Sequence, residues 1–192
     1  MSRRTVVQVT MWNSPYLGNF MHAQLALAHA VRERFGLDTH LVLAAGADGQ
    51  PWLTDLAREG LTFSIPPPGA RGLATHLRKV LAEGPPALIH SHFTAGDLVA
   101  ARAARSARVP CIWHVHTGFE GYPRGQRVKD VVKMRVVARW GVARILTVSP
   151  WLSDLTLRRG APPARIVTVP NAIVLDRFAS LPPRAQPPGH PR

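Results

Sequence analysis

The 192-residue chain contains 46% hydrophobic and 18% charged residues, which is enough apolar material for the core of one ordinary domain and excludes a globally disordered protein. Its 24 lysine and arginine residues outnumber the 11 acidic residues, and the formal net charge of +13 favours anionic partners such as phosphate groups or acidic lipid headgroups. The single cysteine, Cys111, excludes an intramolecular disulfide and a cysteine-based zinc site, and no apolar run reaches the length of a membrane span. We therefore expect a cytoplasmic protein.

Short apolar segments alternate with helical patterns along most of the chain. Strands are predicted at 5–11, 41–44, 61–65, 87–90, 111–115, 144–148 and 166–169. Helices are predicted at 20–34, 52–58, 73–81, 96–107 and 128–140, and from Pro150 to a closing Gly160. The alternation predicts an α/β fold, doubly wound around a mainly parallel sheet of about seven strands. We expect this domain to occupy residues 1–180, followed at 181–192 by a proline-rich tail or truncated interdomain linker.

The loop after the first predicted strand is a candidate ligand site, because open α/β sheets bind ligands beyond the carboxyl ends of their strands. Gly18 in this loop would let the backbone approach a ligand, and the helix that follows would offer its free amides to an anion. A turn that needs a positive φ explains the same glycine equally well. The Gly-x-Gly-x-x-Gly pattern is absent, so a nicotinamide cofactor is unsupported.

Two His-x-His elements end consecutive predicted strands, His90 with His92 and His114 with His116. Residues two apart on a strand point to the same side, so each pair is directed coherently. Four imidazoles could form the zinc site of a metal-dependent hydrolase. We favour the alternative, in which one member of each pair is a packed, hydrogen-bonded histidine and the other lines a polar cleft, because the sequence offers no clear carboxylate partner beyond Asp97.

The glycine-bearing loop after His116 is the second candidate ligand site. His116 stands at its mouth, directly before Thr117 and Gly118, and is the histidine that we expect to contact substrate. Glu120 in the same loop is a candidate general acid or base, although glutamates in loops usually face solvent.

Basic side chains gather on two amphipathic segments. Arg71, Arg78 and Lys79 belong to the first, and a second group spans 124–139. Such helices can rest on an anionic membrane surface, although a solvated basic face is an equally good interpretation. No nucleic-acid motif and no interleaving of aromatic with basic residues is present, so we expect no nucleic-acid partner.

Five segments, in order and with matching spacing, resemble motifs of one enzyme family. The sequence is similar, up to about Phe178, to the N-terminal domain of retaining, family-4-type glycosyltransferases of the GT-B fold. The segments that carry the resemblance are 14–20, 87–92, 109–118, 145–149 and 166–178.

This resemblance implies a Rossmann-like half of a two-domain hexosyltransferase-like enzyme that needs no metal or other cofactor. In the family the N-terminal domain binds the acceptor (a glycan, lipid or small molecule), and a C-terminal domain binds the nucleotide-sugar donor. Carried over to this sequence, His116 and Glu120 are the candidate catalytic residues. The candidate residues for binding donor or acceptor are Gly18, Asn19, His92, Thr117, Gly118, Ser149 and Asn171. Some relatives contact membrane lipids through a basic segment, which implicates Arg71, Arg78 and Lys79.

The sequence also departs from the family pattern. Asn19 replaces a second glycine, Met21 a glutamate, Ala172 a glycine and Val174 an aspartate. No counterpart of the C-terminal donor-binding domain is present, so we expect slow transfer or none from this chain alone. It would be a fragment, a split subunit completed in trans, or a non-catalytic module that binds a lipid, a glycan or a protein.

Overall fold

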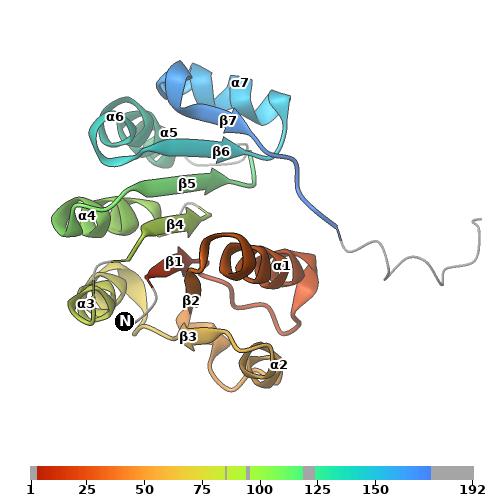
Figure 1. Cartoon of the computed structure of the whole chain (residues 1–192). Helices are drawn as coiled ribbons and strands as arrows, with labels where there is room; N and C mark the ends of the chain where they lie inside the picture. The colour runs from red at the N-terminus through yellow and green to blue at the C-terminus, as the bar shows by residue number, and fades with distance from the viewer. Residues whose placement is uncertain (1–3, 85, 94–95, 119–123, 174–192) are drawn as a thin grey trace, which may run out of the picture.

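The computed structural model describes residues 4–84, 86–93, 96–118 and 124–173, and these form one parallel sheet flanked by helices (Figure 1). The strand order is β3-β2-β1-β4-β5-β6-β7, and every neighbouring pair is parallel. The strands are β1 (Thr5–Val9), β2 (Asp38–Val42), β3 (Thr62–Ser64), β4 (Leu88–His92), β5 (Cys111–Val115), β6 (Arg144–Thr147) and β7 (Ile166–Thr168). The prediction of a doubly wound α/β fold with about seven strands is confirmed.

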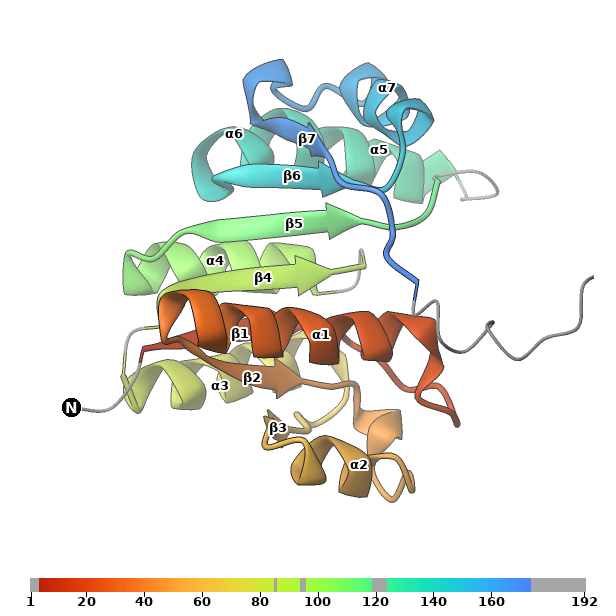
Figure 2. The ribbon, with the colours of Figure 1, turned by 45° about the vertical axis from the view of Figure 1, so that its right-hand side comes forward.

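The direction of winding reverses between β1 and β4, and this reversal places helices on both faces of the sheet. Figure 2 shows α1 (Gly18–Phe35) in front of the sheet and α3 (Gly69–Ala82) and α4 (Asp97–Ala107) behind it. The remaining helices are α2 (Leu53–Arg58), α5 (Arg124–Val132), α6 (Ala138–Gly141) and α7 (Pro150–Arg158). A reversal of this kind separates two neighbouring crossover loops and leaves room for a ligand beyond the strand ends.

The predicted elements have the right type, and their boundaries differ where tertiary structure extends or interrupts the local pattern. β2 begins at Asp38 because the backbone N–H of Asp38 donates to the carbonyl of Arg4, the residue directly before β1. The helix predicted at 128–140 contains a π-helical turn, Lys133–Val137, between α5 and α6. This turn brings Lys133 and Met134 together on the buried side of the helix.

The sheet separates two apolar cores. On the α1 side, Met21, Leu41, Leu43, Trp52 and Leu56 are buried. The larger core on the other side includes Leu73, Leu77, Trp113, Met134 and Ile145. No helix among the described residues is long and apolar enough to cross a bilayer.

A buried ion pair lies within the larger core. Lys133 in the π-helical turn bonds to Asp97, the first residue of α4, and both side chains are nearly inaccessible to solvent. Ser91 Oγ donates to Asp97 Oδ1 at 2.7 Å, and the indole N–H of Trp113 donates to the Asp97 carbonyl at 3.0 Å. Burial raises the pKa of Asp97, and the Lys133 ammonium opposes that rise. The pair therefore ties α4 and the π-helical turn to β4 and β5.

Replacing one member of this pair will destabilise the fold more than replacing both. Lys133→Met leaves a buried carboxylate without its cation, and we expect unfolding free energy to fall by about 3–5 kcal/mol. The double variant Lys133→Met, Asp97→Asn will lose less, and Arg58→Met, in an exposed pair with Asp55, will lose about 0–1 kcal/mol. Urea unfolding measures all three variants, and equal losses for the buried and the exposed pair would contradict the assignment.

Candidate functional site

A cavity of about 650 Å³ lies between α1, the sheet and the segment that follows β7. One end, beside the starts of β1 and β4, is apolar, with Val6, Leu27, Val31 and Leu88 among its lining residues. The other end is polar. Its lining residues include Gln8, Asn19, His90, His92, His114, His116 and Asn171.

The register of β4 and β5 gathers the four histidines at the polar end. His92 pairs with His114 across the two strands, and His90 pairs with Ile112. Because alternate residues on a strand share a face, both His-x-His elements project toward α1. The expectation that each pair is directed coherently is confirmed. The intervening Ser91 points to the opposite face, where it bonds to Asp97. Asp97 is therefore not a carboxylate partner of the histidines.

A chain of side-chain hydrogen bonds crosses the polar end of the cavity. The amide Oε1 of Gln8 lies 2.7 Å from His92 Nε2, and His92 Nδ1 lies 3.1 Å from His116 Nε2. Because an amide oxygen only accepts, His92 donates its Nε2–H to Gln8 and accepts at Nδ1 from His116. His116 also has a side-chain hydrogen bond with Asn171. These contacts fix the orientation and the tautomer of both imidazoles.

Burial keeps all four imidazoles neutral at physiological pH. Together with a smaller effect of the neighbouring imidazoles, it lowers the pKa of His90 and of His114 to about 3. Burial also lowers the pKa of His92 well below its ordinary value, and that of His116 to about 4 despite the opposing bond with Asn171. Neutral rings both donate and accept hydrogen bonds, so they suit hydroxyl-bearing ligands.

Aromatic side chains surround His116 and were not anticipated from the sequence. Phe20 presents its ring edge-on to His116, with centroids 5.4 Å apart, and Phe93 packs on the same imidazole at 4.8 Å. Trp12 packs against Phe20 at 5.2 Å. Gln8 was not anticipated as a site residue either. It had a visible signal, because it is a polar residue within the otherwise apolar run of β1.

The structure brings four of the predicted site residues together and leaves the others apart. His92, His116, Asn19 and Asn171 line the same cavity. The residues that do not line it are Gly18, Thr117, Gly118 and Ser149. Glu120 lies outside the described residues.

Local geometry accounts for two of these outlying positions. Gly18 begins α1 with a φ of +65°, and an added Cβ would stand 3.1 Å from the Trp12 ring, so the turn itself requires glycine. Ser149 caps α7, its Oγ accepting from the Leu152 N–H at 3.2 Å. Thr117 is exposed and Gly118 half-buried in the segment after β5.

The predicted basic residues lie away from the cavity, on the opposite side of the sheet. Arg71, Arg78 and Lys79 are exposed on α3, whose apolar residues Leu73 and Leu77 are buried in the core. Since that apolar face is already packed, α3 can contact a surface through its exposed charged side chains but not through Leu73 and Leu77.

The model of Glycosyltransferase Family 4 matches residues 22–177, which is most of the chain. The chain belongs to this family. The resemblance inferred from the five sequence motifs is therefore confirmed. A comparison with curated proteins finds no significant match.

Solved structures share the fold of this family-4 domain at low sequence identity. Anabaena Alr3699/HepE in complex with UDP-glucose has a TM-score of 0.68 and 17% identity, covering 91% of this chain and 45% of HepE. A glycosyltransferase from Rickettsia africae has a TM-score of 0.68 and 12% identity, covering 95% of this chain and 47% of its own. The lipopolysaccharide outer core galactosyltransferase WaaB has a TM-score of 0.67 and 11% identity, with 89% and 46% covered. The family-4 domain thus spans about half the length of these proteins.

Gln8 is expected to hold the tautomer of His92. In Gln8→Leu the buried Nε2–H loses its acceptor, and we expect unfolding free energy to fall by about 1–3 kcal/mol. The ¹⁵N NMR spectrum will show the Nε2–H tautomer of His92 in the wild type and a mixture in the variant. Gln24→Leu is the matched control, because Gln24 is buried in the same cavity and its Oε1 has no partner. Gln24→Leu should leave the free energy of unfolding unchanged or raise it. Equal losses of this free energy in Gln8→Leu and Gln24→Leu would contradict the assignment.

Proposed function

We propose that this chain is the acceptor-binding half of a retaining glycosyltransferase that transfers a sugar from a nucleotide-sugar donor to a glycan, lipid or small-molecule hydroxyl. The observation that carries the proposal is the position of His116 in a family-4 domain. It lies at the polar end of the cavity, held by His92 and Asn171 and in contact with the rings of Phe20 and Phe93. Fixed, neutral and half-buried, it is suited to position a substrate hydroxyl.

The proposed reaction is simple in its bond changes. The acceptor oxygen bonds to the anomeric carbon, the bond from that carbon to the nucleoside diphosphate breaks, and the acceptor proton leaves on the diphosphate. His116 orients the reacting groups, and the free amides at the start of α1 stabilise the charge of the leaving group. We assign no metal ion or other cofactor to this step. Glu120 stays a candidate acid or base.

The donor side is proposed to come from a second domain, linked to this chain or supplied in trans. Two observations support this assignment. The chain spans about half the length of the structures it resembles, and the structure of HepE, one of them, contains UDP-glucose. Residues 181–192, the proposed linker or tail, lie outside the described residues.

Joining the chain to a donor-binding family-4 half should produce sugar transfer that depends on His116. The measurement is release of UDP from UDP-glucose and other uridine nucleotide sugars, with the two halves fused or mixed. We expect His116→Ala to lower the rate by roughly 10²–10⁴-fold, as loss of a positioned catalytic group does. His76→Ala, on α3, should leave the rate unchanged. Absence of transfer with every donor half, or an unchanged rate in His116→Ala, would overturn the proposal.

A second candidate, a non-catalytic binding module, is favoured by one contact. Asn19 Nδ2 donates to the Ala172 carbonyl at 2.9 Å, so two residues that replace glycines of the family pattern bond to each other at the cavity edge. A glycine at 19 has no side chain to form this bridge. The bridge ties the start of α1 to the segment after β7, where a catalytic domain needs access for its donor. Asn19→Gly would break the bridge and raise transfer in the joined enzyme if access is limiting.

We also propose that the chain rests peripherally on an anionic, cytoplasmic membrane face through Arg71, Arg78 and Lys79. The exposure of these side chains and the net charge of +13 support this contact. α5 and α6 offer an alternative surface, because Val128, Val132, Val136 and Trp140 are exposed along it. That surface adds an apolar stripe, which α3 does not have.

Vesicle sedimentation distinguishes the two surfaces. Neutralising Arg71, Arg78 and Lys79 with glutamine should weaken binding to vesicles of phosphatidylcholine and phosphatidylglycerol roughly 100-fold, since each basic residue contributes about 1 kcal/mol. Glutamine at three exposed arginines elsewhere, Arg58, Arg108 and Arg158, changes the net charge equally and should weaken binding far less. If the double variant Val132→Ser, Val136→Ser loses vesicle binding instead, the contact lies on α5 and α6, and the α3 assignment is contradicted.

A further inference from the structure

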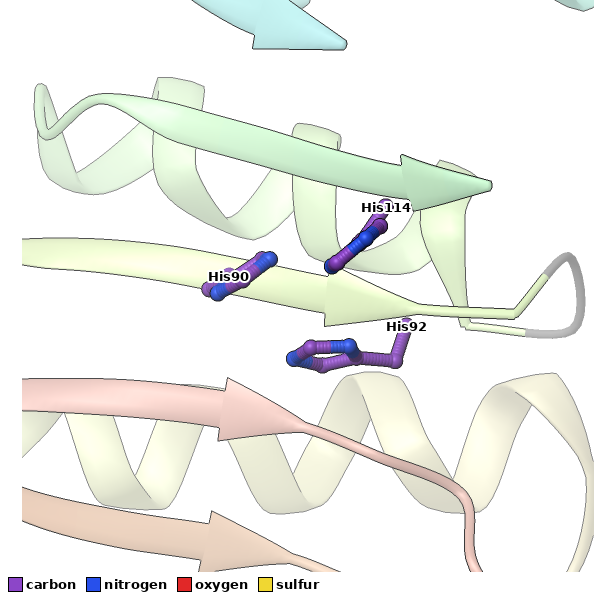
Figure 3. Close-up of side chains that lie close together, drawn as sticks. All are labelled: His90, His92 and His114. Carbon is purple, nitrogen blue, oxygen red and sulfur yellow. The ribbon is translucent and has the colours of Figure 1, made fainter. Parts of the chain in front are cut away.

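Three histidines converge at the floor of the cavity, and their grouping goes beyond what sugar transfer requires. His90 and His92 project from β4 and His114 from β5, with their rings gathered at one point of the sheet (Figure 3). One ring nitrogen from each lies within 4.8 Å of the other two. His116 carries the proposed contact with substrate and stacks on His114 with ring centroids 4.0 Å apart, so these three rings form a group that adjoins it.

Three ring nitrogens on two of these histidines lack hydrogen-bond partners. His90 Nε2, His114 Nδ1 and His114 Nε2 are buried and unpaired within the described part of the chain. A buried polar atom without a partner costs about 1–3 kcal/mol. Several such atoms close together therefore point to a bound ion or molecule that supplies the partner these nitrogens lack in the protein.

The three imidazole nitrogens indicate which kind of ion would bind. Three neutral imidazoles are the ligands that zinc and neighbouring transition metals prefer, and three histidines leave one coordination position open. Calcium and magnesium are disfavoured because they need oxygen ligands, and no Asp or Glu is among the described residues that line the cavity. The chemistry thus favours a divalent transition metal.

The three ring nitrogens must come closer together to coordinate such an ion. Nitrogens on one tetrahedral zinc stand roughly 3.4 Å apart, since Zn–N bonds are about 2.0–2.1 Å. The His114 ring centroid is 5.5 Å from that of His90 and 5.3 Å from that of His92, whereas His90 and His92 are 4.0 Å apart. Binding therefore requires the His114 ring to move toward the other two rings, and the unpaired nitrogens of His90 and His114 have no hydrogen bond to lose.

Gln8 supplies the orienting contact that metal-bound histidines usually have. It accepts the Nε2–H of His92 and so leaves the lone pair of the ring on Nδ1. That lone pair now faces His116 at 3.1 Å. An ion bound there would replace the His92–His116 hydrogen bond and release His116.

From this arrangement we propose that His90, His92 and His114 form a binding site for one divalent transition-metal ion, with zinc as the representative ion. The site stands independently of the proposed transferase activity, because it is defined by binding alone. Its occupancy competes with the hydrogen bond that fixes His116, so the ion acts on the position of that residue and takes no part in sugar transfer.

Metal binding to the full chain tests the proposal directly. After removal of metals with a chelator, titration with Zn²⁺ should show one ion per chain by calorimetry, and Co²⁺ should develop the visible absorption of a four-coordinate site. His90→Gln and His114→Gln should each weaken zinc binding by more than the roughly 10–100-fold that loss of an outer contact costs, and Gln8→Leu should weaken it within that range.

A second histidine pair in the same chain provides the matched control. His40 and His76 each lie 2.7 Å from Ser64 Oγ, outside the cavity, so His40→Gln and His76→Gln should leave zinc affinity unchanged. Far-ultraviolet circular dichroism confirms that each variant is folded. The proposal is overturned if the wild-type chain binds no stoichiometric Zn²⁺, or if the control pair reduces affinity as much as His90→Gln and His114→Gln.

Discussion

The parallel pairing of β4 with β5, with His92 opposite His114, is the constraint on which the site depends. The side-chain period of a strand is two, so a shift of one residue in β4 would turn His90 and His92 away from the cavity and Ser91 toward it. Ser91 is held on the far face by Asp97, which Lys133 in turn neutralises. The buried ion pair in one core therefore helps to maintain the orientation of the histidines that face the other.

Burial gives these histidines their chemical character. In water an imidazole is partly protonated near neutral pH, whereas here burial disfavours the charged form and leaves hydrogen bonding as the main interaction. A continuous chain of hydrogen bonds links Gln8, His92, His116 and Asn171, whereas His90 and His114 retain ring nitrogens without a partner. The same cavity thus combines a satisfied hydrogen-bond chain suited to a hydroxyl ligand with an unsatisfied set suited to a metal ion.

The departures from the family pattern also gain a physical meaning. Asn19 and Ala172 are separated by 153 positions in the sequence, yet the side chain of one bonds to the carbonyl of the other at the edge of the cavity. The amide side chain thus adds a link between the start of α1 and the segment after β7. A family-4 domain with this link has a more restrained cavity edge than one with glycine at both positions.

The sequence by itself determined the alternation of strands and helices, the family, and the common direction of each His-x-His pair, because periodicity reports how side chains point within one element. It did not identify Gln8, Phe20 and Phe93 as neighbours of His92 and His116, nor the pairing of Asp97 with Lys133. Gln8 and His92 are 84 positions apart, and they meet because β1 and β4 are adjacent at the reversal of the sheet. Only the tertiary structure decided these contacts, since the strand order sets which side chains share a cavity and local patterns carry no record of it.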